Sequence, residues 1–308
     1  MPILCAIVGA TGVGKTKCSL ALAKEFHAEI ISMDSRQIYR GFRIGTAQPS
    51  AEALETVPHH LVDFLSPEER FSAGDFARMV KGLLEKNPEK RYLLVGGTGL
   101  YLQALTDGLA ELPKVSADVR AECADFLERE GLNALYERVR SLDPEAARTI
   151  LPQDKQRLLR ALEISLQTGR KFSELGKERV GGIGRIKTFW LCRERDALYR
   201  RIDERVRQMI EFGWKEEVVN LYANIPTDAP AWQSLGYREM LELLEGRLGE
   251  SQFIECVQKG SRHYAKRQIT WFRHQVSAEL VDLGEGSERA LAKIRQNMDD
   301  VPGLNDKA

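Results

Sequence analysis

The sequence predicts an α/β protein with an open parallel sheet and helices on both faces, plus a small all-helical insert and a helical C-terminal part. Short apolar runs typical of buried parallel strands occupy residues 3–8, 28–33, 91–95 and 186–192. Helical segments with an apolar stripe separate these runs, as in strand–helix–strand units. The first three strands are followed by glycines or polar residues, and the carboxyl ends of parallel strands face a ligand crevice.

Length and composition are those of an ordinary globular protein. The chain has 308 residues, of which 43% are apolar and 29% charged, enough to bury a full core. Its 45 basic and 45 acidic residues cancel, which excludes a bulk polycation but not a local face for nucleic acid. Five scattered cysteines without a C-x-x-C predict reduced thiols and no zinc site. With no signal-peptide pattern and no long apolar window, we expect a soluble, cytoplasmic, monomeric protein without membrane association.

The first strand leads into a glycine-rich loop that fits the pattern G-x-x-x-x-G-K-[ST]. Glycines allow positive φ, so successive N–H groups can converge on a phosphate at the N-terminus of the following helix. The lysine supplies a charge to the terminal phosphate, and the threonine hydroxyl suits Mg²⁺. The pattern predicts a P-loop NTPase-like core, typical of nucleotide- and ATP-binding proteins, that binds a polyphosphate or diphosphate. The loop residues are Gly9, Ala10, Thr11, Gly12, Val13, Gly14, Lys15 and Thr16.

Two further strand ends bring polar groups to the same crevice. The second strand ends on Asp34, which points toward the crevice of Lys15, although a turn or helix cap explains this aspartate equally well. The third strand, residues 91–95, is followed by Gly96-Gly97-Thr98. Many P-loop NTPases carry an aspartate at this kind of strand end to hold Mg²⁺. Its absence weakens the ATPase and GTPase interpretations and leaves Asp34 as the nearest acidic candidate.

A break at a Leu-Pro pair begins a charged helical stretch. We expect it to form an insert over residues 113–149, with residues 1–112 and 150–308 forming the core and the C-terminal helices. The insert could act as a lid over the crevice, and an extra surface helix pair is the other interpretation. The next helix, residues 152–167, is expected to be the crossover that leads into strand 186–192.

The C-terminal part is predicted to be helical and carries most of the clustered basic residues. A long amphipathic helix over residues 195–221, bent at Gly213, has Arg201 and Arg205 one turn apart beside its apolar stripe. Residues 259–274 contain five Lys or Arg, no acidic residue and three aromatics. Such a window is typical of a nucleic-acid surface. A helix that packs its aromatics inward and exposes its charges explains the composition equally well.

Eight segments, taken in order, carry a family resemblance. They are GATGVGKT, DSRQIYRG, GTAQP, PHHLVD, VGGTGLY, QDKQRLLRALEI, SLGYREM and SRHYAKRQITWFR. Together they resemble the bacterial tRNA dimethylallyltransferases, also called tRNA isopentenyl transferases, from Ile3 to about Arg273. Ala10, Gln153 and Ser261 stand where that family usually has Pro, often Asn and frequently Thr. None of these departures removes a group to which chemistry is assigned.

The resemblance implies an enzyme that transfers a dimethylallyl group from dimethylallyl diphosphate to the exocyclic amine of the adenine 3′-adjacent to the anticodon in tRNA. It implies that the P-loop residues hold the diphosphate with Mg²⁺, Thr16 being the metal ligand. Asp34 would be the general base, with Thr98 beside it and Arg205, helped by Arg201, on the leaving group. The implied tRNA-binding residues are Asp34, Ser35, Arg36, Gln37, Gln156, Arg157, Leu158, Leu159, Arg160, Gly236, Tyr237, Arg238, Arg262, Lys266 and Arg267.

Two other functions fit parts of the sequence. The first is a P-loop kinase or prenyltransferase that acts on free nucleotides, and the basic aromatic window at residues 259–274 speaks against it because a free nucleotide needs no such surface. The second is a non-catalytic RNA-binding protein that retains a P-loop. The pairing of Asp34 with Thr98 at neighbouring strand ends speaks against that second function.

Overall fold

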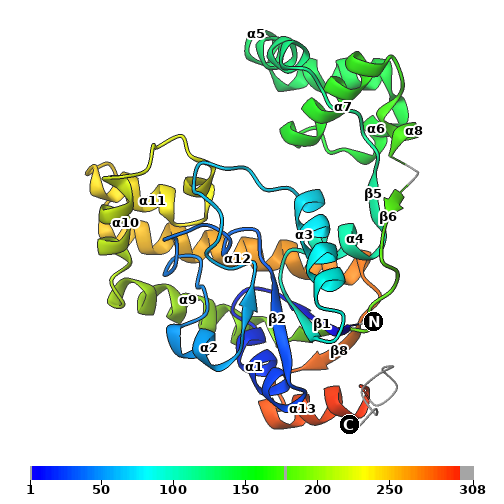
Figure 1. Ribbon diagram of the computed structural model, residues 1–308. Helices are drawn as coiled ribbons and strands as arrows, with labels where there is room; N and C mark the ends of the chain where they lie inside the picture. The colour runs from blue at the N-terminus through cyan, green and yellow to red at the C-terminus, as the bar shows by residue number, and fades with distance from the viewer. Residues whose placement is uncertain (1, 177–178, 299–308) are drawn as a thin grey trace. The chain divides into compact units, whose positions relative to one another are not determined.

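The structure, a computed structural model, describes residues 2–176 and 179–298. The chain divides into two compact units, which are described separately (Figure 1). The first unit contains the residues up to Thr106 and those from Arg185 onward, and the second is Asp107–Gly184. Within the described residues, no helix combines the length and apolar character needed to cross a membrane.

Six parallel strands form the sheet of the first unit, in the order β3-β2-β4-β1-β7-β8. All seven residues of β1 are buried, which explains why this strand is a continuous apolar run in the sequence. The fold class and the four predicted strands are confirmed, and two short edge strands, β3 and β8, are additional. The strands are β1 Ile3–Gly9, β2 Ala28–Met33, β3 His59–His60, β4 Arg91–Gly96, β7 Thr188–Cys192 and β8 Glu279–Asp282.

Helices cover both faces of this sheet (Figure 1). The chain crosses from β1 through β2 to β3 in one direction, and from β3 through β4 and β7 to β8 in the other. Right-handed crossovers therefore place α1 on one face and α3, α4 and α12 on the other. The helices of the first unit are α1 Lys15–Glu25, α2 Ala51–Thr56, α3 Ala73–Lys86, α4 Gly99–Thr106, α9 Arg195–Glu211, α10 Trp214–Tyr222, α11 Tyr237–Leu244, α12 Glu250–Gln275 and α13 Ser287–Gln296, with a 3₁₀ turn at Pro230–Gln233.

The helix predicted over residues 195–221 is two helices, α9 and α10. Gly213 separates them with φ of +89°, a left-handed conformation that favours glycine. The chain direction changes there, so that Trp214 packs into an apolar cluster with Phe42, Tyr237 and Phe253. This cluster is built from residues of α9 to α12 and of the segment 38–65, and it is separate from the apolar cluster formed by the strands of the sheet.

The second unit is larger than the predicted insert over residues 113–149, and its boundaries at 107 and 184 correct that expectation. The helix over residues 152–167 was predicted to be a crossover onto the sheet. It is α7 of the second unit, because its apolar face packs on α5. Leu158 and Leu162 of α7 lie in one apolar cluster with Cys123 and Leu135 of α5. Periodicity identifies an apolar face but not its partner. The elements are β5 Gly108–Ala110, α5 Ala117–Leu142, α6 Pro144–Thr149, α7 Lys155–Thr168, α8 Phe172–Leu175 and β6 Arg179–Gly181, where β5 and β6 pair antiparallel.

Candidate active site

The predicted polar segments meet at the carboxyl ends of three neighbouring strands of the first unit. β1 and β4 are adjacent, and the chain leaves them in opposite directions across the sheet, which creates the crevice where ligands bind in open parallel sheets. The P-loop follows β1, and Thr98 follows β4. Asp34 follows β2, which pairs with β4 on its other side. The structure therefore brings together the three segments that the sequence placed at one crevice.

The P-loop has the conformation that an anion site requires. Gly9, Gly12 and Gly14 have φ of +153°, +77° and +117°, so the loop curls around the N-terminus of α1. The Lys15 ammonium donates to the carbonyl oxygens of Gly9 and Ala10 at 2.8 and 2.9 Å. These two bonds keep the lysine side chain folded over the loop.

Lys15 is partly buried beside the loop. Its burial lowers the pKa of the ammonium from 10.5 to about 8, against the opposing effect of the nearby Asp34 carboxylate. Arg205, a neighbouring cation, lowers the pKa of Lys15 further. A bound anion would offset the unfavourable free energy of two neighbouring cations at this position, because it adds opposite charge between them.

Three arginines brace the outer side of the P-loop. Two of them, Arg201 and Arg205 on α9, were predicted from the sequence. Arg193 was missed, and its place directly after a buried parallel strand is the signal that could have found it. The bonds join Arg205 Nη1 to Thr11 Oγ1 at 3.3 Å, Arg201 Nε to the Gly12 carbonyl at 3.1 Å and Arg193 Nε to the Val13 carbonyl at 2.9 Å.

Asp34 both forms a turn and faces the crevice. Its Oδ1 accepts hydrogen bonds from the backbone N–H groups of Arg36 at 2.8 Å and Gln37 at 3.3 Å. The same carboxylate lines the cavity that contains Lys15. Both interpretations left open by the sequence therefore hold. Since the two backbone bonds go to one oxygen, the other oxygen is available to a ligand.

Thr98 and Tyr264 lie beside this carboxylate. The Thr98 hydroxyl accepts from the backbone N–H of Ser35 at 3.2 Å and shares a hydrogen bond with the hydroxyl of Tyr264. Burial, with the nearby charge of Asp34, raises the pKa of Tyr264 to about 12. The phenol therefore stays protonated at neutral pH and can donate a hydrogen bond.

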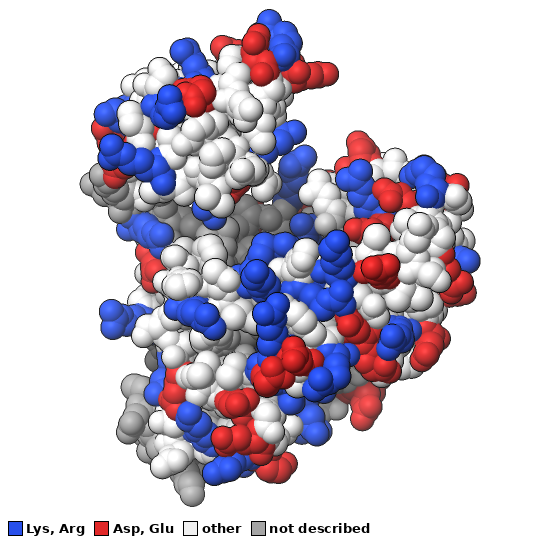
Figure 2. Space-filling model, turned by 180° about the vertical axis from the view of Figure 1, so that it is seen from behind, with Lys and Arg blue, Asp and Glu red and all other residues white. Residues whose placement is uncertain are grey.

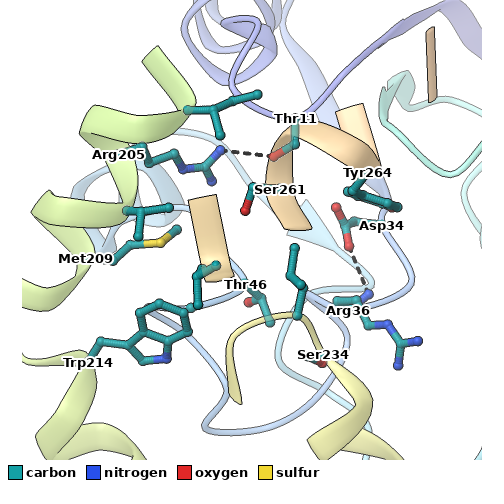
Figure 3. Close-up of a pocket in the computed structure, with 15 residues that line it drawn as sticks. Thr11, Asp34, Arg36, Thr46, Arg205, Met209, Trp214, Ser234, Ser261 and Tyr264 are labelled. Carbon is teal, nitrogen blue, oxygen red and sulfur yellow. Dashed lines mark hydrogen bonds between the residues drawn. The ribbon is translucent and has the colours of Figure 1, made fainter. Parts of the chain in front are cut away.

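A pocket of about 90 Å³ adjoins these groups (Figure 3). Figure 3 shows the guanidinium of Arg205 directed toward Thr11, with Asp34 next to Tyr264 and the apolar side chains of Met209 and Trp214 on another wall. We call it the central pocket. Its lining joins one carboxylate and two arginines to apolar groups, which suits a ligand with an apolar part beside a polar reacting atom. The apolar residues are Ile202, Val206, Met209, Trp214, Leu235 and Val257.

The central pocket shares lining residues with a cavity on each side. Thr11, Asp34 and Arg205 also line a cavity of about 390 Å³ over the P-loop, which includes Lys15 and Thr16. On its other side it shares residues such as Tyr264 with a groove of about 890 Å³, which we call the outer groove. Four arginines and four acidic residues line this groove, and two of the arginines form ion pairs with acidic residues, Arg238 with Glu242 and Arg247 with Glu245, which leaves Arg36 and Arg267 as the other two. Three neighbouring pockets therefore follow one another from the phosphate loop past a carboxylate to this groove.

The P-loop cavity has the donors for a metal ion that arrives with a phosphate ligand. The described residues include no group of three or more His, Cys, Asp or Glu that could hold a metal by themselves. Thr16 and Asp34 both line the cavity. Mg²⁺ typically takes one or two protein oxygens and completes its shell with phosphate oxygens and water. The residues present fit such an ion.

The predicted RNA-binding residues fall into several groups. In the first unit, Arg238, Lys266 and Arg267 are exposed, and Figure 2 shows Lys and Arg gathered in the middle of the face that carries α12. In the second unit, Gln156 and Arg157 at the start of α7 are exposed. The RNA-binding assignment of two side chains, Leu158 and Tyr237, is wrong, because both are completely buried. A motif match does not separate residues that build the local fold from those that touch a ligand.

Arg262 has a partner within the protein. It forms an ion pair with Asp203 of α9 and so links α12 to the helix that carries Arg205. Much of its charge is therefore compensated without RNA.

Tyr237 holds the loop at residues 44–46, part of which lines the central pocket. Its hydroxyl donates to Glu217 Oε1 at 2.6 Å and accepts from the backbone N–H of Gly45 at 3.1 Å. The other oxygen of Glu217 accepts from the backbone N–H of Ile44 at 2.8 Å. These bonds hold the loop against α10 and α11 and thereby position Thr46, which lines the pocket.

Replacing Tyr237 with phenylalanine should lower the free energy of unfolding by about 1–3 kcal/mol, because a partly buried carboxylate oxygen and a backbone N–H lose their partner. Urea denaturation followed by circular dichroism measures the change. Tyr222→Phe is the matched control, since that side chain is 44% exposed and should change stability little. Equal effects of the two substitutions would contradict the role given to the Tyr237 hydroxyl.

Comparison with known proteins identifies the family. A family model described as IPP transferase matches residues 37–275. The chain is 40% identical to the tRNA dimethylallyltransferase of Fusobacterium nucleatum over 288 residues, covering 93% of this chain and 94% of that protein. It is 41% identical to the tRNA dimethylallyltransferase of Halalkalibacterium halodurans, covering 91% of each chain.

Solved structures give the same result. The full-length tRNA isopentenylpyrophosphate transferase of Bacillus halodurans superposes with a TM-score of 0.69 at 36% identity, covering 96% of both chains. A eukaryotic dimethylallyltransferase described as acting on tRNA superposes with a TM-score of 0.80 at 27% identity, covering 98% of this chain and 81% of that one. From the matched family model and from relatives similar over nearly their whole length, we conclude that this chain belongs to the IPP transferase family.

Proposed function

We propose that this protein transfers a dimethylallyl group from dimethylallyl diphosphate to the exocyclic amine of the adenine 3′-adjacent to the anticodon in tRNA, releasing diphosphate. The observation that carries the proposal is the row of three pockets that share lining residues, from the P-loop cavity through the central pocket to the outer groove. A diphosphate, a small apolar group and a nucleotide each find suitable chemistry along it. The relatives named tRNA dimethylallyltransferase support this assignment.

The P-loop end suits the leaving group. As the allylic C–O bond breaks, negative charge develops on the diphosphate, and fixed donors at that position stabilise the transition state. The backbone N–H groups of the loop, Lys15 and Arg205 supply such donors. Mg²⁺, held by Thr16 and the diphosphate, would neutralise part of the same charge. The arginines that brace the loop keep its carbonyl groups turned away from the anion.

The carboxylate of Asp34 suits the acceptor. The exocyclic nitrogen attacks the allylic carbon, the C–O electron pair leaves with the diphosphate, and the nitrogen must then lose a proton. The free oxygen of Asp34 can accept that proton. Since a stacked base cannot enter a pocket, the adenine must be flipped out of the anticodon loop.

The apolar wall of the central pocket has a separate role. An allylic carbon with carbocation character reacts readily with water, and side chains such as Met209 and Trp214 leave little room for it. The pocket thereby favours transfer to the amine over hydrolysis of the donor.

The outer groove suits the RNA around the target base. Ser35, Arg36, Arg238 and Arg267 line it, and a single-stranded loop offers phosphates to arginines and bases to Tyr264. The second unit carries exposed Gln156 and Arg157, which remain predicted RNA contacts. A tRNA substrate agrees with the expected cytoplasmic location, and the monomeric state stays a prediction.

Arg267→Ala should weaken binding of an anticodon stem-loop by about three- to tenfold and reduce the slope of log K against log salt by about 0.7, the value expected when one contact to a single-stranded phosphate is lost. Binding titrations at several salt concentrations measure both quantities. Arg289→Ala, on exposed α13, serves as the control and should leave both unchanged. A loss of affinity that does not depend on salt would contradict a phosphate contact.

The test of the proposed function uses unmodified anticodon stem-loop RNA, labelled dimethylallyl diphosphate and Mg²⁺. We expect label on the adenine next to the anticodon and none on an RNA that carries guanine at this position. Adenosine monophosphate offered as acceptor separates this activity from prenyl transfer to free nucleotides. No transfer to RNA, with transfer to the free nucleotide, would overturn the proposal.

A further inference from the structure

Gln268 is a buried amide on the face of α12 that lines the P-loop cavity and the central pocket. Its side chain is only 6% exposed and lines the P-loop cavity. Ser261 and Tyr264, which line the central pocket, lie seven and four residues before it, so the three residues share one face of the helix. A buried amide must find hydrogen-bond partners, and the position of those partners determines what it does.

The amide joins the two loops that hold the donor and the acceptor groups. Its Oε1 accepts from the backbone N–H of Thr11 in the P-loop at 2.8 Å, and its Nε2 donates to the carbonyl of Gly97 at 3.0 Å. Thr98 follows directly and accepts from the backbone N–H of Ser35. A chain of hydrogen bonds therefore runs from the phosphate loop through Gln268 to the turn formed by Asp34.

The space for this amide comes from Gly97. A Cβ at residue 97 would lie 2.1 Å from Gln268 Nε2, far inside contact distance. The φ of Gly97 is not among the positive values of the described glycines, so the backbone conformation itself does not demand glycine. The missing side chain makes room for the amide, which indicates that the contact is built into the site.

We propose that Gln268 is a positioning residue that fixes the phosphate loop against the strand end carrying Thr98, and so sets the distance from the donor's allylic carbon to the acceptor amine. This inference rests on the proposed prenyl transfer. Gln268 leaves the backbone N–H groups beyond Thr11 and the Lys15 ammonium to the diphosphate, so it acts on alignment more than on donor binding. A misplacement of about 1 Å can cost about 100-fold in rate.

The first test compares Gln268→Met with Gln258→Met. Methionine keeps the length of the side chain and removes both hydrogen bonds. Gln258 is the matched control because it lies on the same helix and donates to a backbone carbonyl, that of Asp203, at 3.0 Å. We expect kcat to fall about 100-fold in Gln268→Met, with the KM for dimethylallyl diphosphate within about threefold of wild type. Gln258→Met should keep kcat within about threefold at a comparable loss of Tm.

The second test is a double-mutant cycle with Gly97→Ala. In the wild-type background the new methyl group displaces the amide, so kcat should fall about as far as in Gln268→Met. In a Gln268→Ala background the amide is gone, and the next atom, the Gly9 carbonyl oxygen, is 3.3 Å from the new Cβ. There Gly97→Ala should lower kcat by no more than about threefold further, because both substitutions break the same contact.

The outcomes separate the two proposals. If the wild-type protein transfers label to RNA while Gln268→Met and Gln258→Met have equal kcat, the positioning role is wrong and the proposed function stands. If the separate kcat losses of Gly97→Ala and Gln268→Ala multiplied in the double variant, the positioning role of Gln268 would also be overturned. If the wild-type protein transfers no label, the proposed function fails and the inference about Gln268 fails with it.

Discussion

Asp34→Asn is expected to lower the turnover number for prenyl transfer about 1,000-fold while leaving the affinity for the anticodon stem-loop nearly unchanged. Asparagine has the shape of aspartate, and its Oδ1 can still accept the backbone N–H groups of Arg36 and Gln37 that form the turn. Its amide cannot accept the proton that the adenine amine must lose. The substitution therefore removes the proposed base and preserves the local fold, which alanine would not do.

Single-turnover rates with saturating RNA and donor measure the loss in the chemical step, and a binding titration measures the affinity. Asp75→Asn is the matched control, because Asp75 also accepts backbone and hydroxyl bonds, at the start of α3, but lies outside the pockets described above. Its rate should equal that of the wild type. A near-normal rate in Asp34→Asn would mean that the carboxylate only builds the turn, and a pure loss of RNA affinity would make it a binding residue.

The long strands of the sheet could be predicted, and its edges could not. Buried parallel strands are continuous apolar runs, so β1, β2, β4 and β7 are visible in the sequence. β3 consists of His59 and His60 only, and it is a strand because it pairs with β2 at the edge of the sheet. β8 is four residues long and follows the long helix α12. Such short strands depend on tertiary pairing, which local patterns do not contain.

The candidate site was predictable to the same extent: local segments could be found from the sequence, and positions set by tertiary packing could not. The P-loop and Asp34 were found because each lies in a short segment whose chemistry is local, and Thr98 was assigned through the family resemblance. Gln268 comes from the middle of a helix, and its role depends on which face of α12 turns toward the sheet. Residues 259–274 left two interpretations open. Ala265 and Phe272 are buried while Lys266 and Arg267 are exposed, as expected for a helix that packs its apolar side chains inward, and the nucleic-acid surface stays a prediction.

The boundary of the second unit could not be read from the sequence for a related reason. The amphipathic pattern of α7 shows that Leu158 and Leu162 face a core, and the sheet and α5 are both apolar enough to provide it. Only the packing on α5 decides between them. The same burial explains why a motif match misassigned Leu158 to RNA contact.

Lys15→Met is expected to lower kcat/KM for dimethylallyl diphosphate by about 100- to 1,000-fold, mostly through KM. Methionine fills the space of the lysine stem but supplies no charge to the diphosphate. Lys17→Met is the matched control, because Lys17 lies on the same helix and is exposed. Steady-state kinetics at saturating RNA measure the effect, and an unchanged KM for the donor would contradict the role of Lys15.

The pH dependence gives this prediction a second, independent form. Burial lowers the pKa of Lys15 to about 8 in the free protein, so the ammonium is charged below pH 8 and loses its proton above it. Because kcat/KM reports ionisations of the free enzyme, its value for the donor should fall about tenfold per pH unit above about pH 8. Lys15→Met has no such group, so its profile should be flat from pH 8 to 9.5. If the wild type and Lys15→Met showed the same fall, the titrating group would be another one, and the charge on Lys15 would not be what holds the diphosphate.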